Sequence, residues 1–345
     1  MAKNKTKNYL KHDTILRDKI LPQIKYNAAQ SEEAEIDLSD ENIHDSQLKM
    51  MFAVCHPSIA AEAQIALALR ILCGFGIDEI ASAFLTNKVT IHKRLVRAKE
   101  KLREENISLE LPPPDEINNR LDAVLRTLYL LYNEGYYTSQ NKNVLHKELC
   151  YEAMRLSFLL IENPHTNLPQ VNALFALMSF HASLFDARLD ENGGLVLYDE
   201  QDETLWDKEL IQQGNYFLQQ SSQGNQLSRY HLEAGIAYWH THKEDTREKW
   251  ENILQLYNQL LMLEYSPIIA LNRTYALSKA NSIDEAIEEA GKLQLAYSHL
   301  YHTLLGELYK GRDKQKALLH FLKALELAKT SADKQLIQRK INALA

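Results

Sequence analysis

The basic residues between Lys88 and Arg103 form the stretch of this sequence with the clearest capacity to bind a ligand. Seven residues in this stretch are Lys or Arg and only Glu100 is acidic, so its net charge is 7 − 1 = +6, whereas the whole chain carries −7 and the remainder therefore −13. Clustered cations in an otherwise acidic chain favour contact with phosphate groups, as in nucleic acid. The alternative interpretation is a solvated charged face, which is common on helices.

Helical spacing predicts how these side chains are displayed. The apolar residues of the stretch recur at i, i+4, i+7 and i+11, which predicts a helix from Lys88 with one buried stripe. These residues are Ile91, Leu95, Ala98 and Leu102. A shorter helix is predicted before it, and Thr86-Asn87 supplies a turn and a capping side chain between the two. The buried positions of this first helix are Ile77, Ile80, Ala81 and Phe84. Two helices joined in this way, the second one basic, predict a helix-turn-helix that enters the major groove of DNA.

The residues predicted to contact DNA lie opposite the buried stripe of the second helix or near its N-terminal end. His92, Lys93 and Arg97 are expected to reach base edges, where polar side chains read sequence. Lys88, Arg94, Lys99 and Lys101 are expected mostly to hold phosphates, which adds affinity without sequence preference. The full set is Lys88, Thr90, His92, Lys93, Arg94, Val96, Arg97, Lys99 and Lys101.

The same segment resembles region 4 of the extracytoplasmic-function (ECF) RNA polymerase sigma factors. The pattern of that region is matched here by Glu79-Ile80-Ala81, Thr90-Ile91, Arg94-Leu95 and Arg97-Ala98-Lys99. The turn departs from the pattern, because Asn87-Lys88-Val89 stands where Ser-x-Gly is usual, but Asn caps a helix equally well. The resemblance implies a DNA-binding domain over residues 47–110 that contacts the −35 element of promoter DNA and the flap of the beta subunit of core RNA polymerase.

Residues 1–46 are expected to hold a remnant of sigma region 2 followed by an acidic linker. Ala2-Lys3-Asn4 and Leu10-Lys11 resemble the last helix of region 2, and residues 30–45 are polar and acidic, with little to bury. The rest of region 2, which in the family binds the polymerase clamp and melts the −10 element, has no counterpart in this sequence. The resemblance therefore does not imply autonomous sigma activity. A frayed basic terminus is the alternative interpretation of the first ten residues.

The segments on either side of the basic helix resemble an ECF sigma group that has a long C-terminal extension. The similarity covers Met51-Phe52-Ala53-Val54-Cys55-His56-Pro57 and the stretch from Arg120 to Tyr136. Between them, residues 111–116 contain three consecutive prolines and predict a domain boundary. Beyond it a helix is predicted, and Gly135 is expected to end that helix in a left-handed conformation. The resemblance implies that the C-terminal domain regulates sigma activity in place of a separate anti-sigma protein.

Residues 117–345 are predicted to form a helical domain with tetratricopeptide (TPR)-like repeats, clearest at 230–330. One pattern recurs at offsets of 37 and 34 residues, in Ala234-Gly235-x-x-Tyr238, Leu271-Asn272-x-x-Tyr275 and Leu305-Gly306-x-x-Tyr309. A period of about 34 residues is that of TPR repeats. Ala317, Phe321 and Ala324 follow at the spacing of a second repeat helix. Such helical hairpins stack and bind a peptide or another protein, and the alternative is a bundle whose inner surface binds nothing.

Composition favours an all-α fold and excludes several other classes. The chain has 11 Gly and 8 Pro in 345 residues, and it is rich in helix-forming residues. No apolar run is long enough to span a membrane and no signal peptide precedes the first motif, so a cytoplasmic protein without a membrane partner is expected. Cys55, Cys73 and Cys150 are widely spaced, which predicts reduced thiols and no metal site. No Gly-rich phosphate loop or hydrolase motif occurs. The protein is therefore not expected to be an enzyme, and no catalytic residue or cofactor is predicted.

Two functional hypotheses follow. The first is an ECF-type sigma factor that directs RNA polymerase to promoters through the −35 element, with a regulatory TPR-like domain. The second is a TPR-type protein-binding scaffold or transcriptional regulator, whose helix-turn-helix has no autonomous sigma activity. The second hypothesis predicts no association with core RNA polymerase.

Overall fold

The computed structural model describes residues 40–344 except 85, 137–145, 189–195 and 225. Within these residues all regular secondary structure is helical and no strand occurs, which confirms the predicted all-α class. Contacts divide the chain into two compact units. Unit 1 comprises Met1–Glu134 and Tyr151–Thr166, and unit 2 comprises Gly135–Cys150 and Asn167–Ala345. The region 2 remnant expected near the N-terminus lies outside the described residues.

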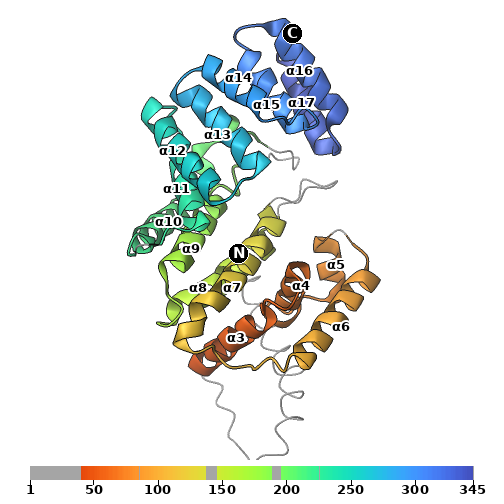
Figure 1. Ribbon diagram of the computed structural model, residues 1–345, viewed down its shortest axis with the longest axis vertical. Coiled ribbons are helices and arrows are strands. Elements are labelled where there is room, and N and C mark those ends of the chain that lie inside the picture. The colour runs from red at the N-terminus through yellow and green to blue at the C-terminus, as the bar shows by residue number, and fades with distance from the viewer. Residues whose placement is uncertain (1–39, 85, 137–145, 189–195, 225, 345) are drawn as a thin grey trace, which may run out of the picture. The chain divides into compact units, whose positions relative to one another are not determined.

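Unit 1 places the basic helix against a small helical core (Figure 1). Its helices are α3 (Asp40–Val54), α4 (Ala61–Ile71), α5 (Ile77–Ala83), α6 (Lys88–Glu104), most of α7 (Pro114–Tyr136) and most of α8 (Lys147–Glu162). Helix α6 packs on both α4 and α5. The core residues from these helices include Met51, Phe52, Leu67, Ile80 and Ile91, each no more than 1% exposed. Burial of such side chains is the main stabilising term for helices of this length.

Long-range hydrogen bonds fix the helices of unit 1 to one another. The guanidinium of Arg120 in α7 donates to the backbone carbonyl of Phe52 in α3 at 2.9 Å. The buried hydroxyl of Thr127 donates to Oε1 of Gln64 in α4, also at 2.9 Å. These bonds satisfy polar groups that would otherwise be costly to bury, so α7 supports the helices that carry the basic segment.

The boundaries of two helices differ from the sequence-based expectation. Helix α3 begins at Asp40, so residues 40–46, expected to belong to the acidic linker, are helical. Neither Pro nor Gly occurs there to stop the helix, and Asn42, His44 and Ser46 are exposed on it. Pro114 begins α7, where its missing N–H costs nothing, and residues 111–116 lie within unit 1.

The prediction that Gly135 ends α7 in a left-handed conformation is wrong. Helix α7 continues through Gly135 to Tyr136, and Gly135 does not have a positive φ. A Cβ at this position would lie 2.8 Å from both the Cys150 sulfur and the His146 carbonyl oxygen. The absent side chain therefore permits the start of α8 to approach closely, a long-range requirement that the local sequence does not reveal.

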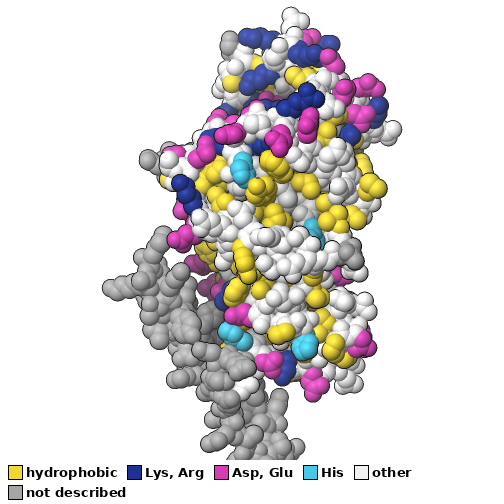
Figure 2. Space-filling view, turned by 90° about the vertical axis from the view of Figure 1, so that its left-hand side faces the viewer, with side chains coloured by type: hydrophobic (Ala, Val, Ile, Leu, Met, Phe, Trp, Pro, Cys, Tyr) yellow, Lys and Arg dark blue, Asp and Glu magenta, His cyan; other side chains and the backbone are white. Residues whose placement is uncertain are grey.

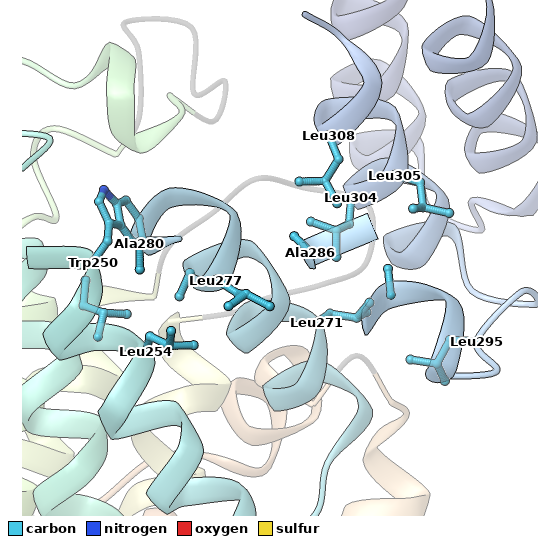
Figure 3. Packing of buried hydrophobic residues seen from close by; sticks show 13 residues of the cluster. Trp250, Leu254, Leu271, Leu277, Ala280, Ala286, Leu295, Leu304, Leu305 and Leu308 are labelled. Carbon is cyan, nitrogen blue, oxygen red and sulfur yellow. The ribbon is translucent and has the colours of Figure 1, made fainter. Parts of the chain in front are cut away.

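Unit 2 is a succession of packed helices. They are α9 (Pro169–Ser183), α10 (Lys208–Ser221), α11 (Arg229–His240), α12 (Arg247–Leu263), α13 (Pro267–Ala280), α14 (Ile283–Lys292), α15 (His299–Tyr309), α16 (Lys314–Leu327) and α17 (Ser331–Asn342), with 3-10 turns η2 (Tyr198–Glu200) and η3 (Glu203–Leu205). Figure 3 shows one core cluster, in which Trp250 and Leu254 of α12 lie near Leu277 and Ala280 of α13. The same cluster continues to Leu304, Leu305 and Leu308 of α15. Pro267 begins α13, as a helix-starting proline is expected to do.

The three members of the recurring sequence pattern lie in α11, α13 and α15 of unit 2. Gly235 lies in α11 and Gly306 in α15, and each faces the helix that follows it. A Cβ on Gly306 would lie 2.5 Å from the ring of Phe321, and a Cβ on Gly235 would lie 3.1 Å from Leu256. Ala317, Phe321 and Ala324 of α16 are all 0% exposed. Small residues thus let neighbouring helices pack closely.

Candidate nucleic-acid interface

The start of α6 is fixed by a capping side chain. Oδ1 of Asn87 accepts hydrogen bonds from the backbone N–H of Thr90 at 2.8 Å and from the Thr90 hydroxyl at 3.0 Å. This is the N-cap predicted from the sequence, and it satisfies one of the free N–H groups at the helix start. Because its hydroxyl already donates to Asn87, Thr90 acts first as part of the cap.

The buried stripe of α6 contains three of its four predicted residues. Ile91, Leu95 and Ala98 are 0%, 5% and 4% exposed, and Ile80 and Ala81 of α5 are 0% and 4% exposed. Ile77, Phe84 and Leu102, predicted to share this burial, are half-buried. One face of α6 is therefore packed within unit 1 and the opposite face is left to solvent.

The exposed face carries most of the residues predicted to contact DNA. His92, Lys93, Arg97 and Lys99 are exposed, and Val96 is 39% exposed. None of these four basic side chains has an ion-pair partner among the residues that the structure describes. A rigid helix that holds several cations apart, without neutralising them, is suited to a polyanion.

Other predicted cations are paired within unit 1. Nζ of Lys88 lies 2.5 Å from Oδ1 of Asp78 in α5. Nη2 of Arg94 lies 3.1 Å from Oε2 of Glu62 in α4, and the guanidinium carbon is 5.9 Å from the Phe84 ring centroid. The Arg94 side chain is 24% exposed, so it faces α4 and α5 more than solvent.

Lys101 is also paired, at the C-terminal end of α6. Its Nζ lies 2.7 Å from Oε1 of Glu105. This hydrogen bond and the opposite charge raise the pKa of Lys101 and lower the pKa of Glu105. Because solvent reaches both partners and screens their attraction, a phosphate could replace the carboxylate at small cost.

One exposed cation was absent from the predicted set. Arg103 is exposed and, like Arg97, has no ion-pair partner within the described part of the chain. It follows His92 by eleven residues, which is about three helical turns, so both lie on the same side of α6. That spacing could have identified it from the sequence.

The cysteines do not form an alternative site. Cys55, Cys73 and Cys150 are buried thiols that form no disulfide. Burial raises the pKa of Cys55 and of Cys150 to about 12, so these thiols are poor nucleophiles at neutral pH. Nδ1 of His56 is 2.8 Å from the Ser58 hydroxyl. No group of three or more potential metal ligands occurs among the described residues.

Comparison with known proteins gives the family of the chain. Residues 120–222 match a family of unknown function, DUF6596. An uncharacterized protein of Rhizobium meliloti (strain 1021) is 32% identical over 344 residues, which cover 95% of this chain and 81% of the relative. The chain belongs to the family of that protein. No solved structure matches this chain. The DUF6596 match ends before α11 and begins after α6, so it includes neither the basic helix nor the recurring pattern of unit 2.

No described helix combines the length and the apolarity needed to cross a membrane.

Proposed function

We propose that α5, the turn and α6 form a helix-turn-helix that binds promoter DNA at the −35 element, and that the protein acts with RNA polymerase as an ECF-type sigma factor. The observation that supports this most is the exposed face of α6, where Lys93, Arg97 and Lys99 have no ion-pair partner in the described part of unit 1. The Asn87 cap and the buried stripe hold this face rigid, as groove binding requires.

In this proposal the DNA-contacting side chains of α6 have different tasks. His92, Lys93 and Arg97 contact base edges, because they project from the exposed face near the middle of the helix. Lys88, Arg94, Lys99 and Lys101 contact phosphates, and Val96 makes an apolar contact in the groove. Lys88, Arg94 and Lys101 are each paired with a carboxylate that a phosphate must first replace, so they contribute less than the unpaired cations.

The experiment is a salt titration of duplex DNA binding, followed by fluorescence anisotropy, with wild-type protein and single variants. The duplexes come from a selection for sequences that the wild-type protein binds. We expect Arg97→Ala to weaken binding by about 1–3 kcal/mol and to relax base preference at one position. Lys101→Ala should weaken binding to all sequences alike and lower the salt slope by about one.

Glu100→Ala is the matched control on the same helix. Glu100 is exposed and acidic, so its removal should leave binding unchanged or strengthen it. An equal loss on every duplex for Arg97→Ala would contradict its assignment to a base. Saturable binding to no duplex at low salt would contradict the DNA-binding proposal itself.

A second candidate function is protein binding by TPR-like repeats in α11 to α16. It is favoured by apolar side chains that reach solvent where α12 passes into α13: Met262, Leu263, Tyr265 and Ile268 are 87%, 52%, 65% and 57% exposed. Hydrophobic side chains are interspersed with charged ones on the face drawn in Figure 2. Exposed apolar residues of this kind mark contact surfaces for other proteins.

Association with core RNA polymerase separates the two candidates. A sigma factor should co-purify with core polymerase when the full chain is isolated from its own cell. A scaffold whose helix-turn-helix only targets DNA should bind DNA but should not co-purify with core polymerase. In both cases Arg97→Ala should affect DNA binding, so this second measurement tests the sigma assignment alone.

A further inference from the structure

Two histidines face each other between neighbouring helices of unit 2. His302 lies in α15 and His320 in α16, and these helices pack on one another. Their Nδ1 atoms are 3.1 Å apart, the ring centroids are 5.4 Å apart and the ring planes differ by 26°. Both side chains are half-buried. Solvent therefore reaches the pair while the helices hold its geometry.

The backbone determines which nitrogen of His302 carries hydrogen. Nε2 of His302 lies 2.9 Å from the carbonyl oxygen of Ala296, which can only accept a hydrogen bond. In the neutral ring Nε2 therefore donates and Nδ1 has a free lone pair. This lone pair points to Nδ1 of His320, which donates to it when no other ligand is present.

We propose that His302 and His320 together bind one divalent transition-metal ion through their Nδ1 atoms. Bonds from zinc to imidazole nitrogen are about 2.0–2.1 Å long. Two such bonds at roughly 90–110° place the nitrogens about 2.9–3.4 Å apart. The observed separation of 3.1 Å falls in this range. To bind the ion, each ring turns in its own plane until its lone pair leaves the line between the two nitrogens and points at the ion. On binding, the hydrogen of His320 moves from Nδ1 to Nε2 through solvent, so the second lone pair becomes available without a change in charge.

The surroundings of the pair resemble the support that metal-binding histidines usually have. A ligating histidine commonly donates its other ring N–H to a backbone carbonyl, as His302 does to Ala296. The ring of His320 stacks on Tyr309, with centroids 5.6 Å apart and planes 3° apart, which limits tilting of the ring out of its plane. Because no third protein ligand occurs among the described residues, water completes the coordination.

One nearby cation opposes metal binding. Nζ of Lys316 is 5.3 Å from the ring centroid of Tyr309, on which His320 stacks. Asp313 lies 3.8 Å from the same ammonium and neutralises it in part. Removal of this positive charge should strengthen binding of a divalent ion, particularly at low ionic strength.

The test is calorimetric titration of the untagged full chain with Cu²⁺, Ni²⁺ and Zn²⁺ at neutral pH. We expect one site per chain, with Cu²⁺ bound most tightly, because imidazole sites follow that general order of affinity. His302→Ala and His320→Ala should each weaken binding about tenfold or more. Lys316→Gln should strengthen it. His299→Ala is the matched control on α15, because His299 Nε2 lies 3.6 Å from Asp333 and does not belong to the pair.

A measurement on the wild-type chain removes dependence on how the variants fold. In nitrogen NMR, Zn²⁺ should shift the Nδ1 resonances of two histidines together and leave their Nε2 resonances in the protonated range. Absence of a saturable site would overturn the proposal, as would wild-type affinity in either histidine variant. An effect of His299→Ala as large as that of His320→Ala would place the ion elsewhere on α15 and would also overturn it.

Discussion

Lys249 at the start of α12 and Arg97 on α6 carry the same charge in opposite surroundings. The Lys249 residue is 1% exposed, and its Nζ donates to the hydroxyl of Tyr198 at 3.1 Å and to the carbonyl oxygen of His242 at 2.5 Å. Arg97 is exposed, and the described part of unit 1 offers it no carboxylate. The difference indicates that the Lys249 charge holds the fold together, whereas the Arg97 charge is available for a partner.

Aromatic rings make the burial of Lys249 tolerable. Its Nζ lies 5.1 Å from the ring centroid of Tyr198 and 5.6 Å from that of Trp250. Such faces attract a cation, and the two oxygen acceptors replace part of its water. Desolvation nevertheless lowers the pKa of Lys249, with the charge of Asp245 acting in the opposite direction. The ammonium is therefore retained by a network built from η2, α12 and the residues between α11 and α12.

The largest expected effect is from Lys249→Ala. Loss of a buried side chain of this size should destabilise unit 2 by about 2–5 kcal/mol, because it leaves a cavity and removes a hydrogen bond to the His242 carbonyl. Lys249→Met keeps most of the stem and should lose less. Denaturant unfolding measures both variants. Equal stability of Lys249→Ala and wild type would contradict the contrast with Arg97, whose replacement should leave unfolding unchanged.

Acidification should act on the same network through His240. Desolvation and then the charge of Lys249 lower the pKa of His240 from 6.5 to about 4. The unfolded chain therefore takes up this proton first, so stability falls as pH decreases from 6.5 towards 4. The full loss is on the order of 3 kcal/mol, since one unit of pKa difference is worth about 1.4 kcal/mol.

Variants separate His240 from other groups that titrate in this range. His240→Phe should flatten the fall in stability between pH 6.5 and 4, measured by denaturant unfolding at a series of pH values. Lys249→Met should make the fall smaller and end it at a higher pH, because removal of a repelling charge brings the folded pKa of His240 closer to its unfolded value. A pH profile of His240→Phe identical to that of wild type would show that this histidine does not determine acid sensitivity.

The comparison of Lys249 with Arg97 also explains which features could be predicted from the sequence. The buried stripe of α6 and the Asn87 cap depend on residues within a few turns, so spacing alone predicts them. Lys249 occupies the polar first turn of α12, and its burial depends on Tyr198, 51 residues away in the sequence. The pairing of Arg94 with Glu62 and the close approach at Gly135 are likewise long-range. Local patterns carry no information about such contacts.

The smallest expected effect is from Asn87→Ala, which tests whether the start of α6 matters for function. Loss of the cap should destabilise unit 1 by about 1 kcal/mol. Asn87→Asp retains an acceptor for the Thr90 N–H and should lose little stability. DNA binding should weaken modestly in Asn87→Ala, because the first turn of α6, with Lys88 and Thr90, frays.

Thr330→Ala provides the matched control in unit 2. The Thr330 hydroxyl caps α17 by accepting from the backbone N–H of Asp333 at 3.0 Å, so its loss should cost a similar free energy of unfolding. That variant should bind DNA as wild type does. If Asn87→Ala abolished DNA binding while stability stayed unchanged, Asn87 would be a direct DNA contact and its capping role would be secondary. If both variants weakened DNA binding equally, general destabilisation would explain the effect. The weaker binding of Asn87→Ala would then not be evidence that DNA contacts α6.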